Sequence, residues 1–533
     1  MRRSILVLAA SALVLAPPLA AQSTAPSVVE RIIDEGTNRS QVMTTAQYLT
    51  DVIGPRLTNS PGYHKAEDWT MEMFRKWGLT NVHKEGFEFG RSWWVERANV
   101  RMTAPRPVEL VATPVAWTPG TDGVVSAPVV LAPLDDDASL EKWKGKLAGK
   151  IVLISAPHGF PEPTEPALKR LSDEDLAKAA AYEIPKVSAE RPGVPSRLSS
   201  QIAFPERRNA FLKAEGAVAF IKLSDRDGKL VGGTAYQFLK SNAPGVPGFD
   251  MAAEDYLRLA RLTEIGITPE LEVMSKVGID DSNTVAGNII ADIPGTDPKA
   301  GYVMAGAHLD SWAAGDGAAD NGAGTAVVME AARIIKASGI RTKRTIRFAL
   351  WGGEEQGLIG SMAYVEKHIA TRPGSENMVG IEKFINWTNG WPITPGPDHG
   401  KLAAYFNLDN GSGRIRGINA QHNPALVPIF EQWFAPFRSM GAGTVSLRKV
   451  GGTDHLFFDA VGIPAFQFIQ DPLDYGSRLH HTSIDTFDHL NAADMKQGAI
   501  ILATFLVNAA NADKPLPRLP FPTAPKPAET QGQ

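Results

Sequence analysis

Six side chains that can bind metal ions occur in order along the second half of the chain. They are His308, Asp320, Glu354, Glu355, Asp409 and His481. Two neutral imidazoles with several carboxylates and no thiolate form the ligand set expected of a hydrolytic zinc centre. A carboxylate beside the ligands can act as a general base. These residues therefore indicate a metallohydrolase, and within that class we expect a peptidase.

The first candidate ligand, His308, is followed two residues later by Asp310. A histidine that binds metal normally donates its other ring N–H to a carboxylate, so Asp310 is a candidate orienting partner. A His-x-Asp triplet alone is common and usually structural. Here it leaves a predicted strand and enters glycine-rich sequence, which favours the functional interpretation.

Asp320 lies in the glycine-rich segment GDGAADNGAG, residues 315–324. A phosphate-binding loop would continue with Gly-Lys-Ser/Thr, which does not follow. A calcium-binding EF-hand loop that began at Asp316 would need an oxygen-bearing side chain at position 318, where the sequence has Ala. A rigidly held carboxylate that bridges two metal ions fits this segment better.

Glu354 and Glu355 place two consecutive carboxylates after an apolar strand and two glycines. Neighbouring side chains point apart, so one can bind metal while the other faces the attacking water. The alternative, a solvated acidic turn, is less consistent with the flanking glycines. In the pair His480–His481 only one residue needs to be a ligand.

A further candidate is Asp454, which follows Gly451-Gly452-Thr453 and precedes His455. Asp454 and His480 could contact the ligands or the substrate. A helix N-cap role for Thr453 or Asp454 is an equally good interpretation.

The elements that position these residues alternate between strand and helix over residues 286–511. Apolar runs predict strands at 301–307, 345–351, 402–408 and 465–469, and helices at 325–336 and 493–511. This alternation predicts an α/β fold with a mixed, mostly parallel sheet covered by helices on both faces. Ligands bind beyond the carboxyl ends of such strands, where His308 and Asp409 stand.

The rest of the chain predicts four further segments. Residues 22–123, with helical spacing at 46–53 and 63–77, form the N-terminal part of the main domain. The sequence pattern changes at residues 124–285, where short strands are predicted near 129–131, 150–154 and 216–221. We expect a separate inserted β-rich domain there. The proline-rich residues 512–533 predict a disordered tail. At the other end, Arg2-Arg3, a short apolar run and small residues up to Ala21 predict a signal peptide over residues 1–21.

Composition narrows the class of partner and compartment. The run of roughly 12 apolar residues in the signal sequence is shorter than the ~20 needed to span a bilayer, so no transmembrane anchor is expected. With no cysteine, thiolate catalysis and a Cys-based zinc site are excluded. A net charge of -4 gives no reason to expect nucleic acid or an anionic membrane as partner. A periplasmic or extracellular protein is the expectation.

Several strings resemble one known family. GAHLDSW, GAADNGAG, WGGEEQGLIGS, NLDNGSG, GGTDHLFF and HHTSIDTF are similar to motifs of the co-catalytic zinc peptidases of family M28, especially of its carboxypeptidase Q-like branch. The resemblance is dense over residues 286–511 and extends to VIGPRLTNSPG near the N-terminus. LAGKIVL and FLKAEGAVAFI, within 124–285, resemble the protease-associated (PA) domain inserted in many members. The implied fold is that of the zinc exopeptidases, phosphorylase/hydrolase-like.

Carried over residue by residue, the resemblance implies two Zn²⁺ ions per chain. The implied ligands are His308, Asp320 and Asp409 for one ion, and Asp320, Glu355 and His481 for the other. Asp320 would bridge the ions, Glu354 would be the general base, and Asp310 would orient a ligand. His481 matches, and not His480, because the family's histidine directly precedes Ser or Thr. Cobalt or manganese could use the same donors.

The expected activity is that of an exported metallo-exopeptidase that acts on short peptides or dipeptides through a metal-bridging water. An aminopeptidase needs a carboxylate near the substrate amine, whereas a carboxypeptidase needs a cation near the terminal carboxylate. Candidates for that cation are Arg414, Arg416, Arg448 and Arg478. A glutaminyl-cyclase-like transferase and a binding module that has lost catalysis are the alternatives. The PA-like domain is expected to restrict substrate size, and a homodimer is left open.

Overall fold

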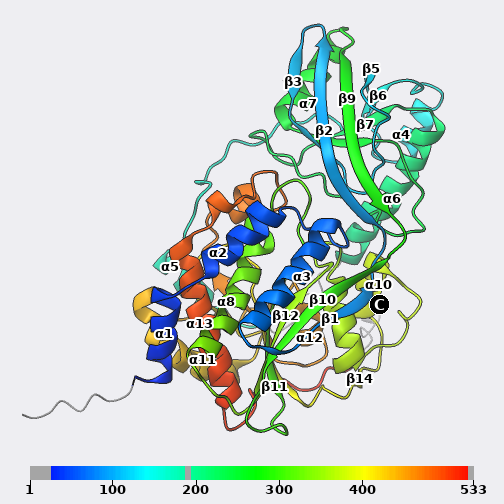
Figure 1. The fold of residues 1–533 in the computed structure, drawn as a ribbon. Coiled ribbons are helices and arrows are strands. Elements are labelled where there is room, and N and C mark those ends of the chain that lie inside the picture. Colours follow the sequence, from blue (N-terminus) through cyan, green and yellow to red (C-terminus); the bar gives the residue numbers. More distant parts are fainter. Residues whose placement is uncertain (1–25, 186–193, 526–533) are drawn as a thin grey trace, which may run out of the picture.

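Two eight-stranded sheets form two lobes in the computed structural model, which describes residues 26–185 and 194–525 (Figure 1). The predicted signal peptide lies outside these residues. The sheet of the main lobe has the order β1-β10-β12-β11-β15-β18-β16-β17. Its strands are β1 (Thr80–Glu88), β10 (Val285–Ile293), β11 (Tyr302–His308), β12 (Thr345–Trp351), β15 (Leu402–Asn407), β16 (Ile415–Asn419), β17 (Thr444–Ser446) and β18 (Ala465–Gln470).

The four central strands, β12, β11, β15 and β18, run parallel, and antiparallel pairs flank them. Every residue of β11 is buried, as expected of a parallel strand covered on both faces. These strands and the helices that follow them confirm the predicted α/β fold with a mixed, helix-covered sheet.

Helices cover the two faces unequally. One face packs against α1 (Val28–Asn38), α2 (Val42–Gln47), α3 (Pro61–Lys76), α8 (Ala323–Ala337), α11 (Val427–Phe434) and α13 (Ala492–Asn511). The other face packs against α9 (Ile359–Tyr364), α10 (Gly380–Trp387) and α12 (Leu456–Ala460). Side chains of a strand alternate between faces, so Val303, Ala305 and Ala307 join the first core, and Tyr302 and Met304 join the second.

The second lobe is built on a sheet with the order β3-β2-β9-β5-β6-β7-β8-β4. Its strands are β2 (Ser92–Ala104), β3 (Val108–Leu110), β4 (Ala112–Pro114), β5 (Val125–Leu131), β6 (Ile151–Leu153), β7 (Ala219–Leu223), β8 (Gly248–Met251) and β9 (Glu270–Asp280). Its helices are α4 (Asp137–Trp143), α6 (Val194–Ala214) and α7 (Ala253–Glu264). The long strands β2 and β9 rise together from the main lobe (Figure 1).

This second sheet begins earlier in the chain than residue 124, the position at which the sequence pattern predicted the start of the inserted domain. β2 pairs with β9 from Ser92↔Asp280 to Ala104↔Glu270, so the chain leaves the main lobe near residue 92. The pairing joins segments far apart in sequence, and no local pattern distinguishes a strand of one lobe from a strand of the other.

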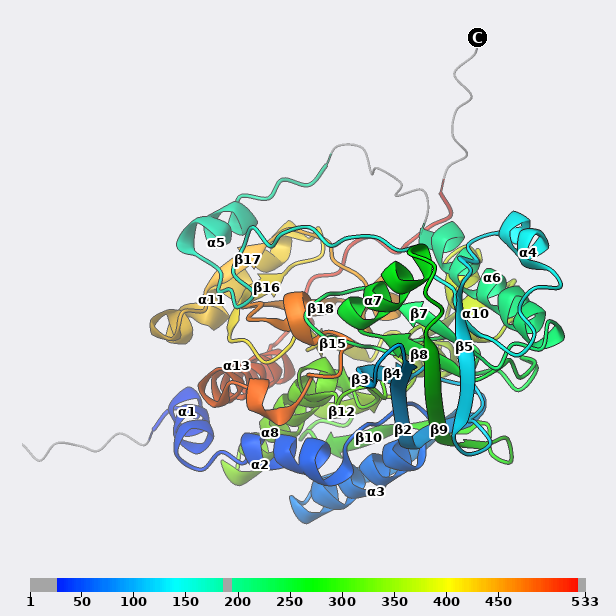
Figure 2. The ribbon, with the colours of Figure 1, turned by 90° about the horizontal axis from the view of Figure 1, so that it is seen from above.

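A strap of residues 155–185 leaves β6 and crosses back to the main lobe, where its helix α5 (Asp173–Ala180) lies beside β17 (Figure 2). Arg170 anchors it, with Nη1 2.8 Å from both Asp471 Oδ2 and Asp494 Oδ2. The backbone N–H of Lys169 donates to the carbonyl of Leu473. The strap therefore contacts the loop that leads to His480 and His481.

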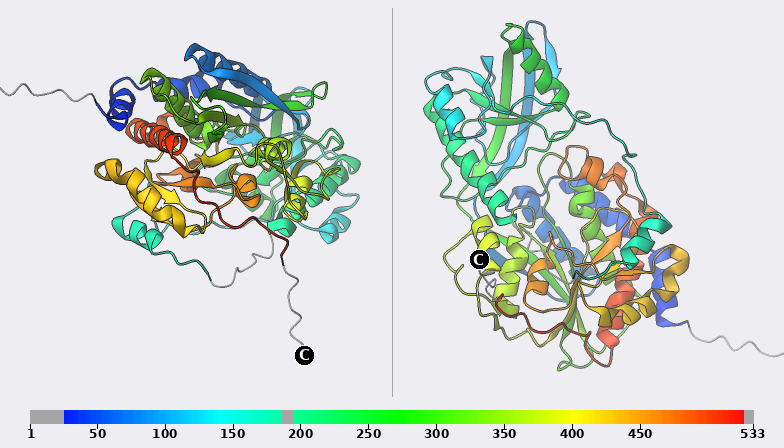
Figure 3. Two further views of the ribbon diagram at one scale, coloured as in Figure 1. Left: turned by 90° about the horizontal axis from the view of Figure 1, so that it is seen from below. Right: turned by 180° about the vertical axis from the view of Figure 1, so that it is seen from behind.

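The segment after α13 runs along the main lobe (Figure 3). Leu516 is buried, and Arg518 donates from Nη2 to the carbonyls of His399 and Leu402. The expectation of a disordered end is therefore wrong for residues 512–525, because proline-rich chain can still dock through an apolar side chain and an arginine. In the described part of the chain, no helix has both the length and the apolar character needed to cross a membrane.

Candidate metal centre

The predicted ligands meet at the carboxyl ends of the central parallel strands. His308 is the last residue of β11, and Asp409 follows β15 by two residues. Glu354 and Glu355 follow β12 after two glycines, and Asp320 lies in the turn before α8. His481 comes from the loop after β18. Parallel strands end at the same edge of the sheet, which is why residues so distant in sequence converge.

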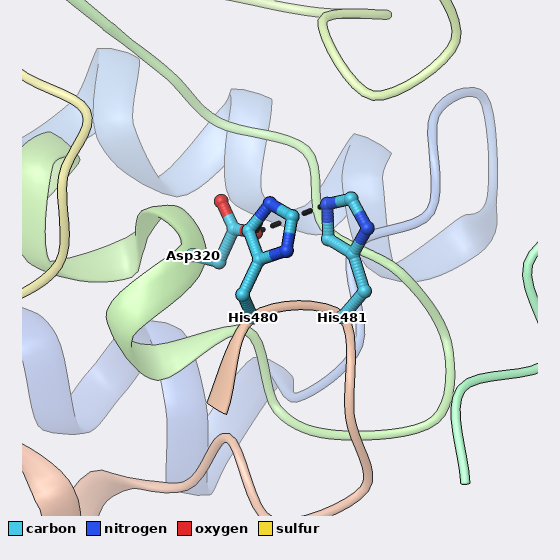
Figure 4. Close-up of side chains that lie close together, drawn as sticks. All are labelled: Asp320, His480 and His481. Atoms are coloured by element: carbon cyan, nitrogen blue, oxygen red, sulfur yellow. Dashed lines mark ion pairs between the residues drawn. The ribbon is translucent and has the colours of Figure 1, made fainter. Parts of the chain in front are cut away.

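Two groups of donor atoms form around Asp320. His308 Nε2 lies 3.3 Å from Asp320 Oδ1 and 3.3 Å from Asp409 Oδ1. His481 Nε2 lies 3.3 Å from Asp320 Oδ2 (Figure 4) and 2.9 Å from Glu355 Oε2. Donors bound to zinc at 2.0–2.1 Å in tetrahedral geometry are about 3.3 Å apart. Asp320 thus presents one oxygen to each group, at spacings that suit a metal ion.

Hydrogen bonding within the cluster is incomplete. Four buried atoms of the predicted ligands have no hydrogen-bond partner among the described residues: His308 Nε2, Asp320 Oδ2, Glu355 Oε1 and Asp409 Oδ1. A buried polar atom left without a partner costs about 1–3 kcal/mol. Each of these atoms is a good donor to a divalent cation, and imidazole with carboxylate suits zinc. The residues present therefore fit a metal centre.

Both consecutive histidines approach Asp320. The rings of His480 and His481 are stacked, with centroids 3.6 Å apart, and His480 Nε2 lies 3.8 Å from Asp320 Oδ2 (Figure 4). His481 is closer to Asp320 and also contacts Glu355. Its φ of 60° lies in the left-handed region, which non-glycine residues seldom adopt and which often marks a functional site.

Glu354 lies beside the first donor group, with Oε2 3.9 Å from His308 Nε2. Burial raises the pKa of Glu354 well above the usual carboxylate range; His308 opposes the rise, and Asp409 and Asp454 add to it. Bound cations would lower this pKa again. A carboxylate with these opposing influences is suited to accepting and releasing a proton near neutral pH.

Asp310 fixes the turn that carries both glutamates. Its Oδ2 accepts from Thr58 Oγ1 at 2.9 Å and from the backbone N–H of Glu355 at 3.3 Å, and its Oδ1 accepts from the N–H of Glu354 at 3.3 Å. His308 Nδ1 is nearer to the backbone carbonyl of Asp310, at 3.0 Å, than to its carboxylate, at 3.5 Å. The sequence predicted that the carboxylate of Asp310 orients His308. In the structure the backbone carbonyl of Asp310 is the closer contact, and the carboxylate mainly organises the turn.

Asp485 and Arg56 were not predicted to have a role, although both lie in strings that resemble family M28. Asp485 accepts from the backbone N–H groups of Ala319 at 2.6 Å and Asp320 at 3.0 Å. Burial raises the pKa of Asp485 to about 7. Arg56 is fully buried and donates to the carbonyl of Leu309 and to two carbonyls of the turn before Asp320. Together they hold the backbone on both sides of the cluster.

Asp454 is buried under the cluster. Within the part of the chain that the structure describes, neither of its carboxylate oxygens has a hydrogen-bond partner. Burial raises its pKa to about 8, against the opposing effect of His308. α12 begins at Leu456 without a side-chain cap, and Thr453 Oγ1 accepts from Asn407 Nδ2 at 3.0 Å, so neither candidate N-cap acts as one.

A cavity of about 490 Å³ opens over the cluster. Carboxylates and the two histidines line its floor, and its apolar wall comprises Tyr236, Leu358, Ile381 and Phe384. Its described lining includes no arginine or lysine. The four arginines that were candidates for binding a substrate carboxylate do not line this cavity. Two of them, Arg414 and Arg416, form ion pairs with Asp494 and Asp471.

Comparisons with known proteins find similarity to peptidases. The model of peptidase family M28 matches residues 288–506. Carboxypeptidase Q of Mus musculus is 26% identical over 474 residues, which cover 88% of this chain and 86% of that protein. A peptidase M28 precursor from Shewanella amazonensis has a TM-score of 0.65 at 23% identity, covering 94% of this chain and 98% of its own. A zinc aminopeptidase from Bacillus subtilis has a TM-score of 0.54 at 20% identity, covering 89% and 95%.

Proposed function

Because residues 288–506 match peptidase family M28, we propose that this chain is an exported exopeptidase that binds two zinc ions and hydrolyses short peptides or dipeptides. The observation that carries the proposal is the arrangement around Asp320, whose two oxygens face two separate histidines at 3.3 Å. A carboxylate in this position can bridge two ions.

In this proposal His308, Asp320 and Asp409 hold one ion, and Asp320, Glu355 and His481 hold the other. When bound, the ions supply positive charge that polarises a carbonyl and lowers the pKa of water. Glu354 accepts a proton from the attacking water and delivers it to the leaving amine, because its carboxylate lines the cavity beside His308. Asp310 and Asp485 act through the backbone, by fixing the loops that carry the ligands.

The size of the cavity favours short substrates. A volume of about 490 Å³ accommodates a few residues and not a folded protein. Tyr236, from the connection between β7 and β8, contributes to its wall, so part of the predicted inserted domain limits the space. This supports the expectation that the PA-like region restricts substrate size.

Export through the signal sequence at residues 1–21, to the periplasm or the medium, belongs to the same proposal and rests on the charge and apolar pattern there. A homodimer stays a prediction.

The test uses the chain purified after removal of residues 1–21. We expect two zinc ions per chain by elemental analysis, loss of peptidase activity on chelation, and recovery when zinc is restored. Glu354→Gln should keep both ions and lose about 10²- to 10⁴-fold in kcat. Retention of near-full kcat would rule out the role of Glu354. Two bound ions with no cleavage of any short peptide would instead favour a cyclase-like or binding function.

A further inference from the structure

A second cavity of about 250 Å³ lies against the loop of His480 and His481. Both histidines line this cavity and the one over the metal cluster, so the two spaces share them as a wall. The remaining lining comes mostly from the second lobe, from residues after β7 and from β8: Ser224, Asp225, Arg226, Gly232, Thr234 and Asp250. The two cavities therefore meet at the stacked imidazoles.

Arg226 is the one cation, among arginines and lysines of the described chain, that lines either cavity. Its Nη1 is buried and has no hydrogen-bond partner within the described residues. Burial lowers the pKa of Arg226, with Asp225 opposing the decrease. Arg226 lines this cavity together with His480 and His481, so the guanidinium lies on the same side of the main lobe as the loop of the two histidines.

The carboxylates around Arg226 do not neutralise it. Asp250 Oδ2 accepts from the N–H of Gly233 at 2.8 Å and lies 3.2 Å from Lys222 Nζ. Asp225 is exposed and, in the described structure, forms no ion pair with Arg226 within 4.0 Å. A half-buried guanidinium with a free donor is therefore available to an anion, and arginine binds carboxylates through two parallel hydrogen bonds.

We propose that Arg226 and the cavity beside His480 form a subsite for the free C-terminal carboxylate of a peptide whose scissile bond lies at the metal cluster. The inference rests on the peptidase function proposed above and makes that function carboxypeptidase- or dipeptidase-like. The chain beyond the scissile bond must then be short, because it must end at Arg226. The second lobe thereby supplies a specificity residue to a site built by the main lobe.

The test compares a dipeptide with a free carboxylate, Leu-Ala, and its C-terminal amide. Wild-type protein should cleave the acid with the higher kcat/KM. Arg226→Met should raise KM for the acid about 10- to 100-fold, with little change in kcat, and should leave the amide unaffected. Arg226→Lys should restore part of the preference. Arg207→Met, which removes an exposed arginine of α6 that pairs with Asp137, is the matched control and should behave as wild type.

Binding gives a readout independent of turnover. Calorimetry on zinc-loaded Glu354→Gln should show tighter binding of Leu-Ala than of its amide, and adding Arg226→Met should abolish that difference while zinc content and Tm stay unchanged. An equal acid-to-amide ratio in wild type and Arg226→Met would overturn the subsite and leave the peptidase proposal standing. Failure of zinc-loaded wild type to cleave either peptide would overturn both.

Discussion

Replacing Arg56 with Met should destabilise the main lobe and weaken metal binding together. The side chain is fully buried and donates five hydrogen bonds, all to backbone carbonyls. The acceptors are Leu49 at 3.1 Å, Gly54 at 3.0 Å, Leu309 at 2.8 Å, Asp316 at 2.8 Å and Gly317 at 2.7 Å. Leu309 follows His308 directly, and Gly317 precedes Asp320 by three residues, so one side chain ties together the loops of two predicted ligands.

The magnitude follows from two opposing effects. A hydrogen bond from a charged donor contributes about 1.5 kcal/mol at the lower end of its range, so the five bonds contribute roughly 7 kcal/mol. Against this, burial lowers the pKa of Arg56 to about 10 from 12.5, a cost of about 3 kcal/mol for holding the charge there. Met fills similar volume without the charge. We therefore expect the free energy of unfolding to fall by about 4 kcal/mol.

The assay is urea denaturation of the metal-free protein, followed by a zinc Kd from competition with a chelator. Arg101→Met is the control, since Arg101 is exposed and lies 3.5 Å from an exposed Glu109; it should change the free energy of unfolding by less than about 1 kcal/mol. Arg56→Lys should be intermediate, because one ammonium cannot reach five carbonyls. If Arg56→Met unfolds like the control and binds zinc like wild type, the loops are held by other contacts and the reasoning is wrong.

Two further predictions concern metal binding and pH. Asp320→Ala should lose zinc at both positions, because its two oxygens face both donor groups; elemental analysis that finds two tightly bound ions would exclude the bridge. Burial raises the pKa of Glu85, but hydrogen bonds and charge from His368 and Lys367 outweigh it, so the pKa is lower than in the unfolded chain. The stabilisation is therefore present above the unfolded value of 4.5 and is lost as the pH falls through the lower folded value. Wild type should be more stable than Glu85→Gln at pH 7 by urea denaturation, and a difference that persisted unchanged at the lowest pH at which the protein folds would contradict this.

The buried parallel strands were the most predictable elements. β11, β12, β15 and β18 lie within a residue or two of the segments expected, because strands covered on both faces are continuous apolar runs bounded by turn residues. The proximity of His308 and Asp409 could be predicted for the same reason, because both residues come directly after predicted strands of this kind. The roles of the individual residues came from the family resemblance and stay predictions.

What the sequence did not reveal depends on contacts between distant segments. Arg56 hydrogen-bonds to carbonyls more than 250 positions away, and arginine is ordinarily a surface residue, so nothing local marks it as buried. Arg226 lies in an exposed turn of the other lobe, and only the fold brings it beside His480. Of the arginines that the sequence did suggest, Arg414 and Arg416 are held in ion pairs with the buried Asp494 and Asp471.

Contacts between distant segments are also needed because the predicted ligands bring several carboxylates close together. Asp320, Glu355 and Asp409 crowd their carboxylates within a few ångströms of two imidazoles, and like charges at such distances repel strongly in a buried site. Before metal binds, the two imidazoles oppose that repulsion. Burial lowers the pKa of His481, but the carboxylates beside it outweigh burial and raise that pKa to about 10. The backbone N–H groups directed at Asp310 and Asp485, and the guanidinium of Arg56, fix the loops that carry the ligands and leave ligand oxygens such as Asp320 Oδ2 without a hydrogen-bond partner among the described residues. Cations that bind the folded chain and not the unfolded one should then stabilise it by RT ln(1 + c/Kd), where c is the free cation concentration. The contacts that leave the ligand atoms free to bind a cation therefore also couple metal binding to folding.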